Sequence, residues 1–166
     1  MKVTILPITE THAASFRESL DLVARERRYL AMAEAPPLEQ VESFVRGNVA
    51  NDVAQFVALD GERVVGWADI VPARTYAIAH CGSLGMGVLR DYRGQGIGRR
   101  LLEACIAKAW SQDITRIQLE ARADNAHAIR LYEHLGFAYE AVKHRGMRID
   151  GEYFDTVQMS LLRHEA

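Results

Sequence analysis

The stretch "LRDYRGQGIGRRLL" (residues 89–102) decides the fold of this chain of 166 residues. Three glycines and four arginines occupy its fourteen positions, between two apolar stretches. Glycines let backbone N–H groups approach an anion closely, and a helix that starts directly afterwards adds unpaired donors and a partial positive charge. The stretch therefore predicts a phosphate-binding loop at the start of a helix.

Two common phosphate-binding loops do not match the spacing of these glycines. Gly94, Gly96 and Gly98 are spaced G-x-G-x-G, whereas a dinucleotide-binding loop needs G-x-G-x-x-G and normally opens its fold. A P-loop needs Gly-Lys followed by Ser or Thr, but Arg99 and Arg100 follow the last glycine here. The spacing excludes both loops, and with them a nicotinamide-dependent oxidoreductase.

Composition places the chain among ordinary globular proteins. Hydrophobic residues make up 49% and charged residues 25%, which predicts one domain over residues 1–166. The formal net charge of −2 argues against a general nucleic-acid binder. The start lacks a signal peptide, and no apolar run reaches the roughly eighteen residues that a membrane span needs. We therefore expect a cytoplasmic protein with no nucleic-acid or membrane partner. Cys81 and Cys105 have no metal-ligand spacing, so we expect core cysteines and no metal.

The periodicity of apolar residues predicts a single mixed α/β domain. Asp60-Gly61 and Asp150-Gly151 are typical of hairpin turns. Asn125 is a candidate N-cap, and Gly136 a candidate C-terminal stop, for one helix. Helices are expected over residues 12–30, 38–49, 97–109 and 125–135, and strands over 3–8, on both sides of Asp60-Gly61 within 56–71, and over 80–89, 115–121, 139–148 and 153–161.

Two motifs resemble those of a known family. Arg93-x-x-Gly96-x-Gly98 resembles the Arg/Gln-x-x-Gly-x-Gly/Ala signature of the GNAT superfamily of N-acetyltransferases, whose loop binds the coenzyme A pyrophosphate. "DNAHAIRLYEHLGF" (124–137) is similar to the family's next motif, Asn-x-x-Ala followed by Tyr and Gly-Phe. The resemblance covers about residues 79–161. It implies an α/β (α+β) fold with a mixed, mostly antiparallel sheet of six to seven strands, about four flanking helices, and splayed central strands.

The resemblance also implies that acetyl-coenzyme A is the cosubstrate. The backbone of residues 86–88 would pair with the pantetheine amides, and the N–H of Val88 would face the thioester oxygen as an oxyanion donor. Backbone donors of residues 94–99 would hold the pyrophosphate, and the helix-start arginines Arg93, Arg99 and Arg100 would add positive charge, where the helix dipole otherwise disfavours cations. The residues implied in binding are Met86, Gly87, Val88, Arg93, Gly94, Gln95, Gly96, Ile97, Gly98, Arg99, Asn125, Ala128 and Tyr132.

Acetyl transfer to an amine needs a group that takes a proton from the ammonium and one that protonates the departing thiolate. Tyr132 matches the family's tyrosine near the thioester sulfur and is the candidate acid. Glu120 resembles the strand glutamate that acts as base in some ribosomal-protein N-terminal acetyltransferases, directly or through water; a surface glutamate is the alternative. Other family members carry a glutamate where Ser83 stands here. His80 and Asp69 are lower-ranked candidates for the base.

The acceptor is constrained mainly by the chemistry of amines. At pH 7 an α-amine with a pKa near 8 is about a tenth deprotonated, whereas a lysine amine near 10.4 is below about a thousandth. Since no strong base stands out, the sequence favours a small amine, an amino acid or a peptide α-amine as acceptor. A protein N-terminal or lysine acetyltransferase and an acetyl-coenzyme A-binding regulatory module stay open. The family implies acceptor recognition by residues 27–40 and 144–156 and a possible homodimer, for which no stretch specifies an interface.

Overall fold

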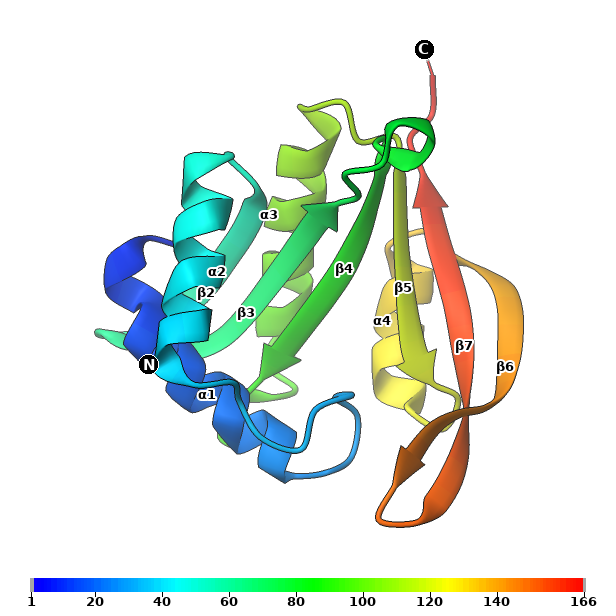
Figure 1. Cartoon of the computed structure of the whole chain (residues 1–166), viewed down its shortest axis with the longest axis horizontal. Coiled ribbons are helices and arrows are strands. Elements are labelled where there is room, and N and C mark those ends of the chain that lie inside the picture. The colour runs from blue at the N-terminus through cyan, green and yellow to red at the C-terminus, as the bar shows by residue number, and fades with distance from the viewer. Residues whose placement is uncertain (1, 166) are drawn as a thin grey trace.

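The computed structural model describes residues 2–165 and shows one seven-stranded sheet with helices on both faces (Figure 1). The strand order is β1-β2-β3-β4-β5-β7-β6, and every pair is antiparallel except β4–β5. The strands are β1 (Thr4–Pro7), β2 (Ala54–Asp60), β3 (Arg63–Pro72), β4 (Cys81–Val88), β5 (Arg116–Arg122), β6 (Ala138–Ile149) and β7 (Glu152–Leu162). The helices are α1 (Ala13–Arg25), α2 (Leu38–Ala50), α3 (Ile97–Trp110) and α4 (Ala126–His134), with short 3-10 turns η1 (Glu10–His12), η2 (Tyr76–Ile78) and η3 (Arg90–Tyr92). This architecture confirms the predicted fold class.

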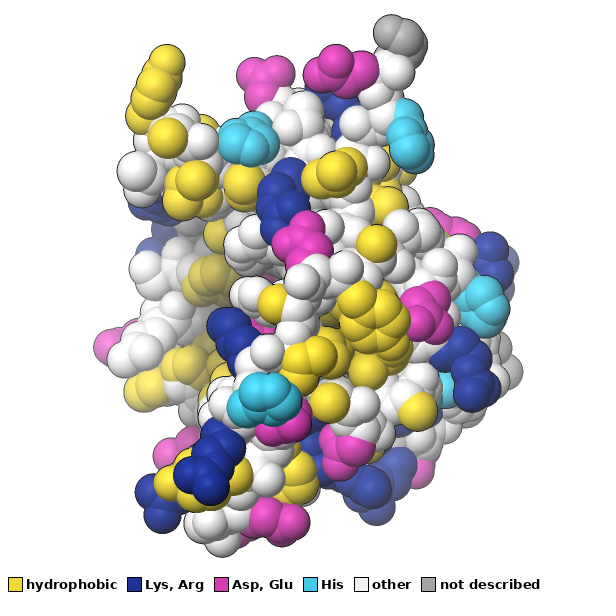
Figure 2. All heavy atoms as spheres, turned by 90° about the vertical axis from the view of Figure 1, so that its right-hand side faces the viewer, with side chains coloured by type: hydrophobic (Ala, Val, Ile, Leu, Met, Phe, Trp, Pro, Cys, Tyr) yellow, Lys and Arg dark blue, Asp and Glu magenta, His cyan; other side chains and the backbone are white. Residues whose placement is uncertain are grey.

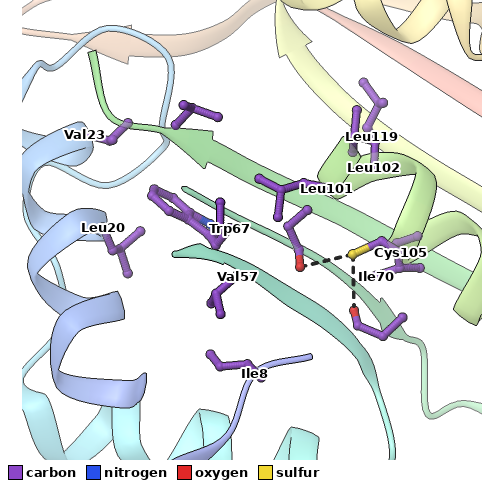
Figure 3. Close-up of a cluster of buried hydrophobic side chains, with 14 of the residues drawn as sticks. Ile8, Leu20, Val23, Val57, Trp67, Ile70, Leu101, Leu102, Cys105 and Leu119 are labelled. Atoms are coloured by element: carbon purple, nitrogen blue, oxygen red, sulfur yellow. Dashed lines mark hydrogen bonds between the residues drawn. The ribbon is translucent and has the colours of Figure 1, made fainter. Parts of the chain in front are cut away.

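The apolar positions of the central strands pack against helices on both faces of the sheet. On one face the ring of Trp67 in β3 meets Phe16 of α1 edge-on, with centroids 5.6 Å apart. On the other face the Cys105 thiol of α3 donates to the carbonyl of Ala68, at 3.2 Å (Figure 3). Because side chains alternate along a strand, these neighbours on β3 fix which helix covers which face. We call them the α1/α2 face and the α3/α4 face.

The central pair β4–β5 is joined over only three residue pairs. Cys81, Gly82 and Ser83 pair with residues 116–118, and no register pair follows. Beyond that point the two strands diverge, as the lower half of Figure 1 shows. Residues 84–88 of β4 and 119–122 of β5 therefore face one another without pairing. We call this opening the split; it is the splayed arrangement that the sequence predicts.

The predicted turns are confirmed, and one predicted helix is too long. β2–β3 and β6–β7 are hairpins whose turns contain Gly61 and Asp150-Gly151, all with positive φ. The helix expected over residues 12–30 ends at Arg25, because Arg27 adopts a left-handed conformation (φ 48°) that stops the helical path. Leu30 is partly buried against the core from the following loop, so its apolar character reflects this packing rather than helical periodicity.

The segment 26–37 between α1 and α2 connects the two halves of the sheet. The Arg27 guanidinium pairs with the Asp150 carboxylate of the β6–β7 turn at 2.6 Å. The Arg122 guanidinium at the end of β5 donates to the carbonyl of Arg28 at 2.8 Å and lies 3.6 Å from the ring centroid of Phe154. Through these contacts the segment reaches from α1 to the strands on the far side of the split.

Charge is distributed evenly on the side of the molecule that carries β6 and β7. Figure 2 shows basic, acidic and histidine side chains interspersed over this side rather than gathered by sign. Within residues 2–165, no helix is long and apolar enough to cross a membrane.

Candidate active site

The open edge of β4 presents backbone groups to the split. The N–H of Leu89 donates to Val65 of β3 at 2.9 Å. Because hydrogen-bonding direction alternates along a strand, the N–H groups of Met86 and Val88 point away from β3 and into the split. The Val88 carbonyl accepts a hydrogen bond from the Arg93 side chain at 2.8 Å. An extended ligand in the split could therefore pair with β4 as an additional strand would.

The glycine loop that follows β4 supplies further backbone donors. Gly94 and Gly96 have φ of 73° and 77°, and a Cβ on either would meet no atom within 4 Å. Gly96 is the N-cap of α3 and the first intrahelical bond runs from Arg100 to its carbonyl. Among the described residues, the N–H groups of residues 97–99 make no backbone hydrogen bond. Bare backbone donors at a helix N-terminus fit an anionic diphosphate such as that of coenzyme A.

Two other glycines, Gly87 of β4 and Gly98 of the loop motif, are explained by packing within the protein. A Cβ on Gly87 would lie 2.3 Å from the indole of Trp67, so this position has room for no side chain. A Cβ on Gly98 would lie 3.1 Å from the Met86 methyl and 3.5 Å from Leu131 of α4. The resemblance implies Gly87 in coenzyme binding; the structure gives a further reason for a glycine there, because the Trp67 indole fills the space on the α1/α2 face.

The three arginines of the loop each have a partner inside the protein. Arg93 forms two hydrogen bonds with the Glu26 carboxylate, at 2.8 and 3.1 Å, besides its bond to the end of β4. Arg99 pairs with Glu103 one turn later at 2.8 Å. Arg100 donates twice to a backbone carbonyl near β1 at 3.1 Å. Internal contacts thus account for part of the positive charge that the sequence assigned to an anionic partner.

The second motif forms the start of α4 and places Tyr132 in the core. The Asn125 side chain accepts a hydrogen bond from the Ala128 N–H at 3.3 Å, which confirms it as the N-cap. Tyr132 is only 7% exposed, and its ring packs against Phe137 with centroids 5.8 Å apart. Burial raises the pKa of Tyr132 to about 12. The hydroxyl is therefore protonated at neutral pH, as a proton donor must be.

Glu120 lies on β5 where that strand borders the split, and its carboxylate already has two partners. Lys143 donates to one oxygen at 2.8 Å and the Thr156 hydroxyl to the other at 2.6 Å. Burial alone would raise the pKa of Glu120, but these hydrogen bonds and the lysine charge outweigh it and lower the pKa. The side chain is ionised, and each contact that stabilises the carboxylate weakens it as a base.

The lower-ranked base candidates lie at different distances from the split. His80 precedes β4 at the paired end, where its carbonyl accepts from the β5 backbone, and Ser83 is the last paired residue and is exposed. Asp69 of β3 pairs with Gly85 of β4, the strand that borders the split, and burial raises the pKa of Asp69 to about 7. The sequence signal for it was a single acidic residue within the apolar run "VVGWADIV" (64–71).

Neither cysteine borders the split. Cys105 is fully buried against the sheet, and burial raises the pKa of its thiol well above the usual range. Cys81 lies at the paired end of β4 and is half-buried. Among residues 2–165, no three His, Cys, Asp or Glu side chains are grouped so that they could hold a metal ion.

The family model described as "Acetyltransferase (GNAT) family" matches residues 19–137. The chain belongs to the GNAT acetyltransferase family. The matched range contains the open edge of β4, the glycine loop and Tyr132, so the family assignment and the site geometry concern the same part of the chain.

Curated proteins and solved structures show similar GNAT members. The chain is 51% identical over 47 residues to the [ribosomal protein bS18]-alanine N-acetyltransferase of Escherichia coli K12, covering 28% of this chain and 32% of that protein. It is 34% identical over 83 residues to N-alpha-acetyltransferase 30 of Schizosaccharomyces pombe, covering 49% and 55%. The matches therefore span about a third and about half of these relatives. The structure of yncA of Salmonella typhimurium, a putative acetyltransferase with its cofactor acetyl-CoA, has a TM-score of 0.91 at 19% identity, covering 99% and 95%; this likeness concerns the fold.

Proposed function

We propose that this GNAT protein is an N-acetyltransferase that moves the acetyl group of acetyl-coenzyme A to a primary amine by direct attack in a ternary complex. The observation that carries the proposal is the open edge of β4, which leads directly into a loop whose backbone donors have no partner in the described chain. A ligand with an amide-containing arm and a diphosphate matches both parts of this surface.

Each part of the site has a role in holding the coenzyme. The backbone of Met86 and Val88 would pair with the pantetheine amides, and the donors of residues 94–99 would bind the diphosphate. Acetyl-coenzyme A supplies an activated acetyl thioester. The Val88 N–H would face the developing negative charge on the thioester oxygen, where a positioned donor contributes most. Arg93 holds the end of β4 in place through its bond to the Val88 carbonyl.

Proton transfer completes the reaction. The amine nitrogen bonds to the acetyl carbon as the carbon–sulfur bond breaks, and Tyr132 gives its proton to the departing thiolate. The proton that the acylated nitrogen then loses restores the tyrosine hydroxyl through solvent. The buried, protonated hydroxyl supports this role. The ammonium of the acceptor must first lose a proton. Glu120 borders the split on β5 and is one carboxylate that could take this proton, directly or through water.

We propose a small amine, an amino acid or a peptide α-amine as acceptor. The names of two relatives, an alanine N-acetyltransferase and an N-alpha-acetyltransferase, support α-amine chemistry. An α-amine also needs about 3 kcal/mol less help with deprotonation than a lysine side chain. Segment 26–37 and the β6–β7 turn would contact the acceptor, since both lie beyond the open end of the split.

The test combines coenzyme binding with acetyl transfer. Acetyl-coenzyme A binding is measured by calorimetry, and thiol release is followed with a panel of amines, amino acids, peptides and lysine side-chain analogues. We expect transfer to α-amines to exceed transfer to lysine analogues. Coenzyme binding without thiol release for any acceptor would favour the regulatory module, and fastest transfer to lysine analogues would overturn the acceptor class.

A matched pair of glycine variants tests the loop. Gly96→Ala places a side chain at a positive φ in the loop, and Gly61→Ala does the same in the β2–β3 turn, with no atom within 4 Å in either case. Both variants should lose similar stability because both strain the backbone. Only Gly96→Ala should weaken coenzyme binding, by about tenfold or more. Equal coenzyme affinity in the two variants would show that the loop does not bind the diphosphate.

A further inference from the structure

Asp69 lies one strand behind the open edge of β4, and no side chain of the described residues pairs with its carboxylate. It lies in the middle of β3, opposite Gly85 of β4, and residues 2–165 provide it with neither an ion pair nor a side-chain hydrogen bond. Glu120, across the split, is held by Lys143 and Thr156. The two carboxylates therefore differ in whether their oxygens can accept a proton from a ligand. The oxygens of Glu120 already accept hydrogen bonds from side chains, and those of Asp69 do not.

The bare backbone of β4 leaves Asp69 accessible from the split. An ideal Cβ on Gly85 would lie 3.4 Å from one carboxylate oxygen of Asp69 and 3.9 Å from the other. Gly85 itself is half-buried, and its neighbour Ser83 is exposed, so this part of the α1/α2 face is open. The missing side chain at Gly85 is the reason that nothing separates the carboxylate from the space beside β4.

Strand register places Asp69 and Glu120 on the same face at the same level of the sheet. Ser83 pairs with Gln118, so Gly85 and Glu120, each two residues further, stand across the split from one another. Side chains two residues apart share a face. Since Asp69 pairs with Gly85 and shares its face with Trp67, both carboxylates lie on the α1/α2 face of the sheet.

The neighbours of Asp69 in the described chain provide no compensating charge, and the one titratable group that feels its carboxylate, the Cys105 thiol of α3, is buried and neutral. The register neighbour of Asp69 on β2 is Gln55, whose Oε1 accepts from Asn48 of α2 and whose Nε2 is a buried donor with no partner in the described chain. Gly85 faces it from β4. The residues that α1 and α2 bury are all uncharged: Ala13, Phe16, Ser19, Leu20, Val23, Ala24, Val41, Val45 and Asn48. Apolar surroundings favour the protonated carboxyl, which is the state that a base reaches after it has taken a proton.

We propose that Asp69 is the group that receives the proton of the acceptor ammonium. The inference rests on the proposed acetyl transfer and names a residue for it. The ammonium nitrogen gives one proton to an Asp69 oxygen, which yields the neutral amine and a neutral carboxyl. The amine then forms the carbon–nitrogen bond as the carbon–sulfur bond breaks, and the thiolate takes a proton from Tyr132. The acylated nitrogen loses its second proton, which restores the tyrosine hydroxyl through solvent, and Asp69 releases its own proton to solvent before the next turnover. Glu120 stays ionised throughout and attracts the cationic acceptor.

Three variants separate this role from its alternatives. Asp69→Asn keeps the shape of the side chain and removes the base, so the single-turnover rate at pH 7 should fall about 10²–10⁴-fold and recover toward high pH. Glu120→Gln should raise KM for a cationic acceptor while the acidic limb of the pH–rate profile stays in place. Gly85→Ala adds a methyl group at ordinary contact distance from the carboxylate, so the protein should fold and lose rate through the blocked approach.

A measurement without turnover tests the same residue. The carboxyl carbon of Asp69 is assigned by comparing ¹³C spectra of the wild type and Asp69→Asn, and its titration is followed in the protein alone. We expect a midpoint near 7. A midpoint near 4, or an Asp69→Asn enzyme whose acidic limb and rate match the wild type, would overturn the assignment. Loss of that limb in Glu120→Gln alone would transfer the role to Glu120. A wild-type enzyme that acetylates no amine would instead remove the proposed function, and the base with it.

Discussion

Asp69→Asn should gain stability relative to the wild type as the pH rises from 5 to 8, although it removes a group from the site. Burial raises the pKa of Asp69 from 3.8 to about 7, so between these values the folded chain holds a proton that the unfolded chain releases. The stability that this proton provides is complete below pH 4, falls as pH rises, and is lost above pH 7. Asparagine is neutral at every pH, so the variant does not show this loss of stability.

The size of the effect follows from the shift. A shift of three pKa units changes the free energy of unfolding by about 4 kcal/mol over the whole range. The two units between pH 5 and pH 7 account for about 2.7 kcal/mol of this change. The difference in unfolding free energy between Asp69→Asn and the wild type should therefore move by about 2–3 kcal/mol in favour of the variant between pH 5 and pH 8. Contributions of the histidines are common to both proteins and cancel in this difference.

Urea unfolding followed by tryptophan fluorescence at pH 5, 6, 7 and 8 measures the effect. Glu120→Gln is the matched control: the pKa of Glu120 is lowered on folding, so its contribution is complete above the unfolded pKa and does not change between pH 5 and pH 8. If the stability curves of the wild type and Asp69→Asn stay parallel over this range, the carboxyl titrates in its ordinary range and the reasoning about its environment is wrong.

Two further changes test the other parts of the site. Tyr132→Phe should keep coenzyme affinity and the fold, because only the hydroxyl is lost, and lower the single-turnover rate about 10²–10⁴-fold; a wild-type rate would refute the acid role. Arg93→Ala should weaken coenzyme binding by freeing the end of β4, and Glu26→Gln should reproduce part of that loss, because the Glu26 carboxylate holds Arg93. Calorimetry decides between the possibilities: full affinity in Glu26→Gln with a large loss in Arg93→Ala would mean that Arg93 contacts the coenzyme itself.

The sequence predicts the architecture well because its signals are local. Hairpin turns need residues that tolerate positive φ, and the Asp-Gly pairs at 60–61 and 150–151 lie at the two turns. The N-cap at Asn125 is likewise a short-range pattern. The predicted end of α1 was wrong, because the stop at Arg27 depends on the path of segment 26–37. Contacts with Asp150 and Arg122, far along the chain, set this path.

The chemistry of the site depends on contacts that the sequence does not display. Nothing near Glu120 in the sequence indicates that Lys143 and Thr156 hold its carboxylate. In the same way, Asp69 lies in an apolar run that predicts a strand, and the feature that exposes it is the missing side chain of Gly85 on the neighbouring strand. Sequence patterns identify the residue types, whereas strand register decides which of them share a surface.

The contact between Trp67 and Gly87 has a consequence for how this protein can change during evolution. The indole occupies the place where a Cβ at position 87 would lie, so the two positions cannot vary independently. A side chain at 87 requires a smaller residue at 67, and a chain that keeps the tryptophan must keep the glycine. Position 87 lies on the open edge of β4, so the residue at position 67 in the core of β3 determines which residues can stand at this edge. In related sequences the two positions should therefore co-vary.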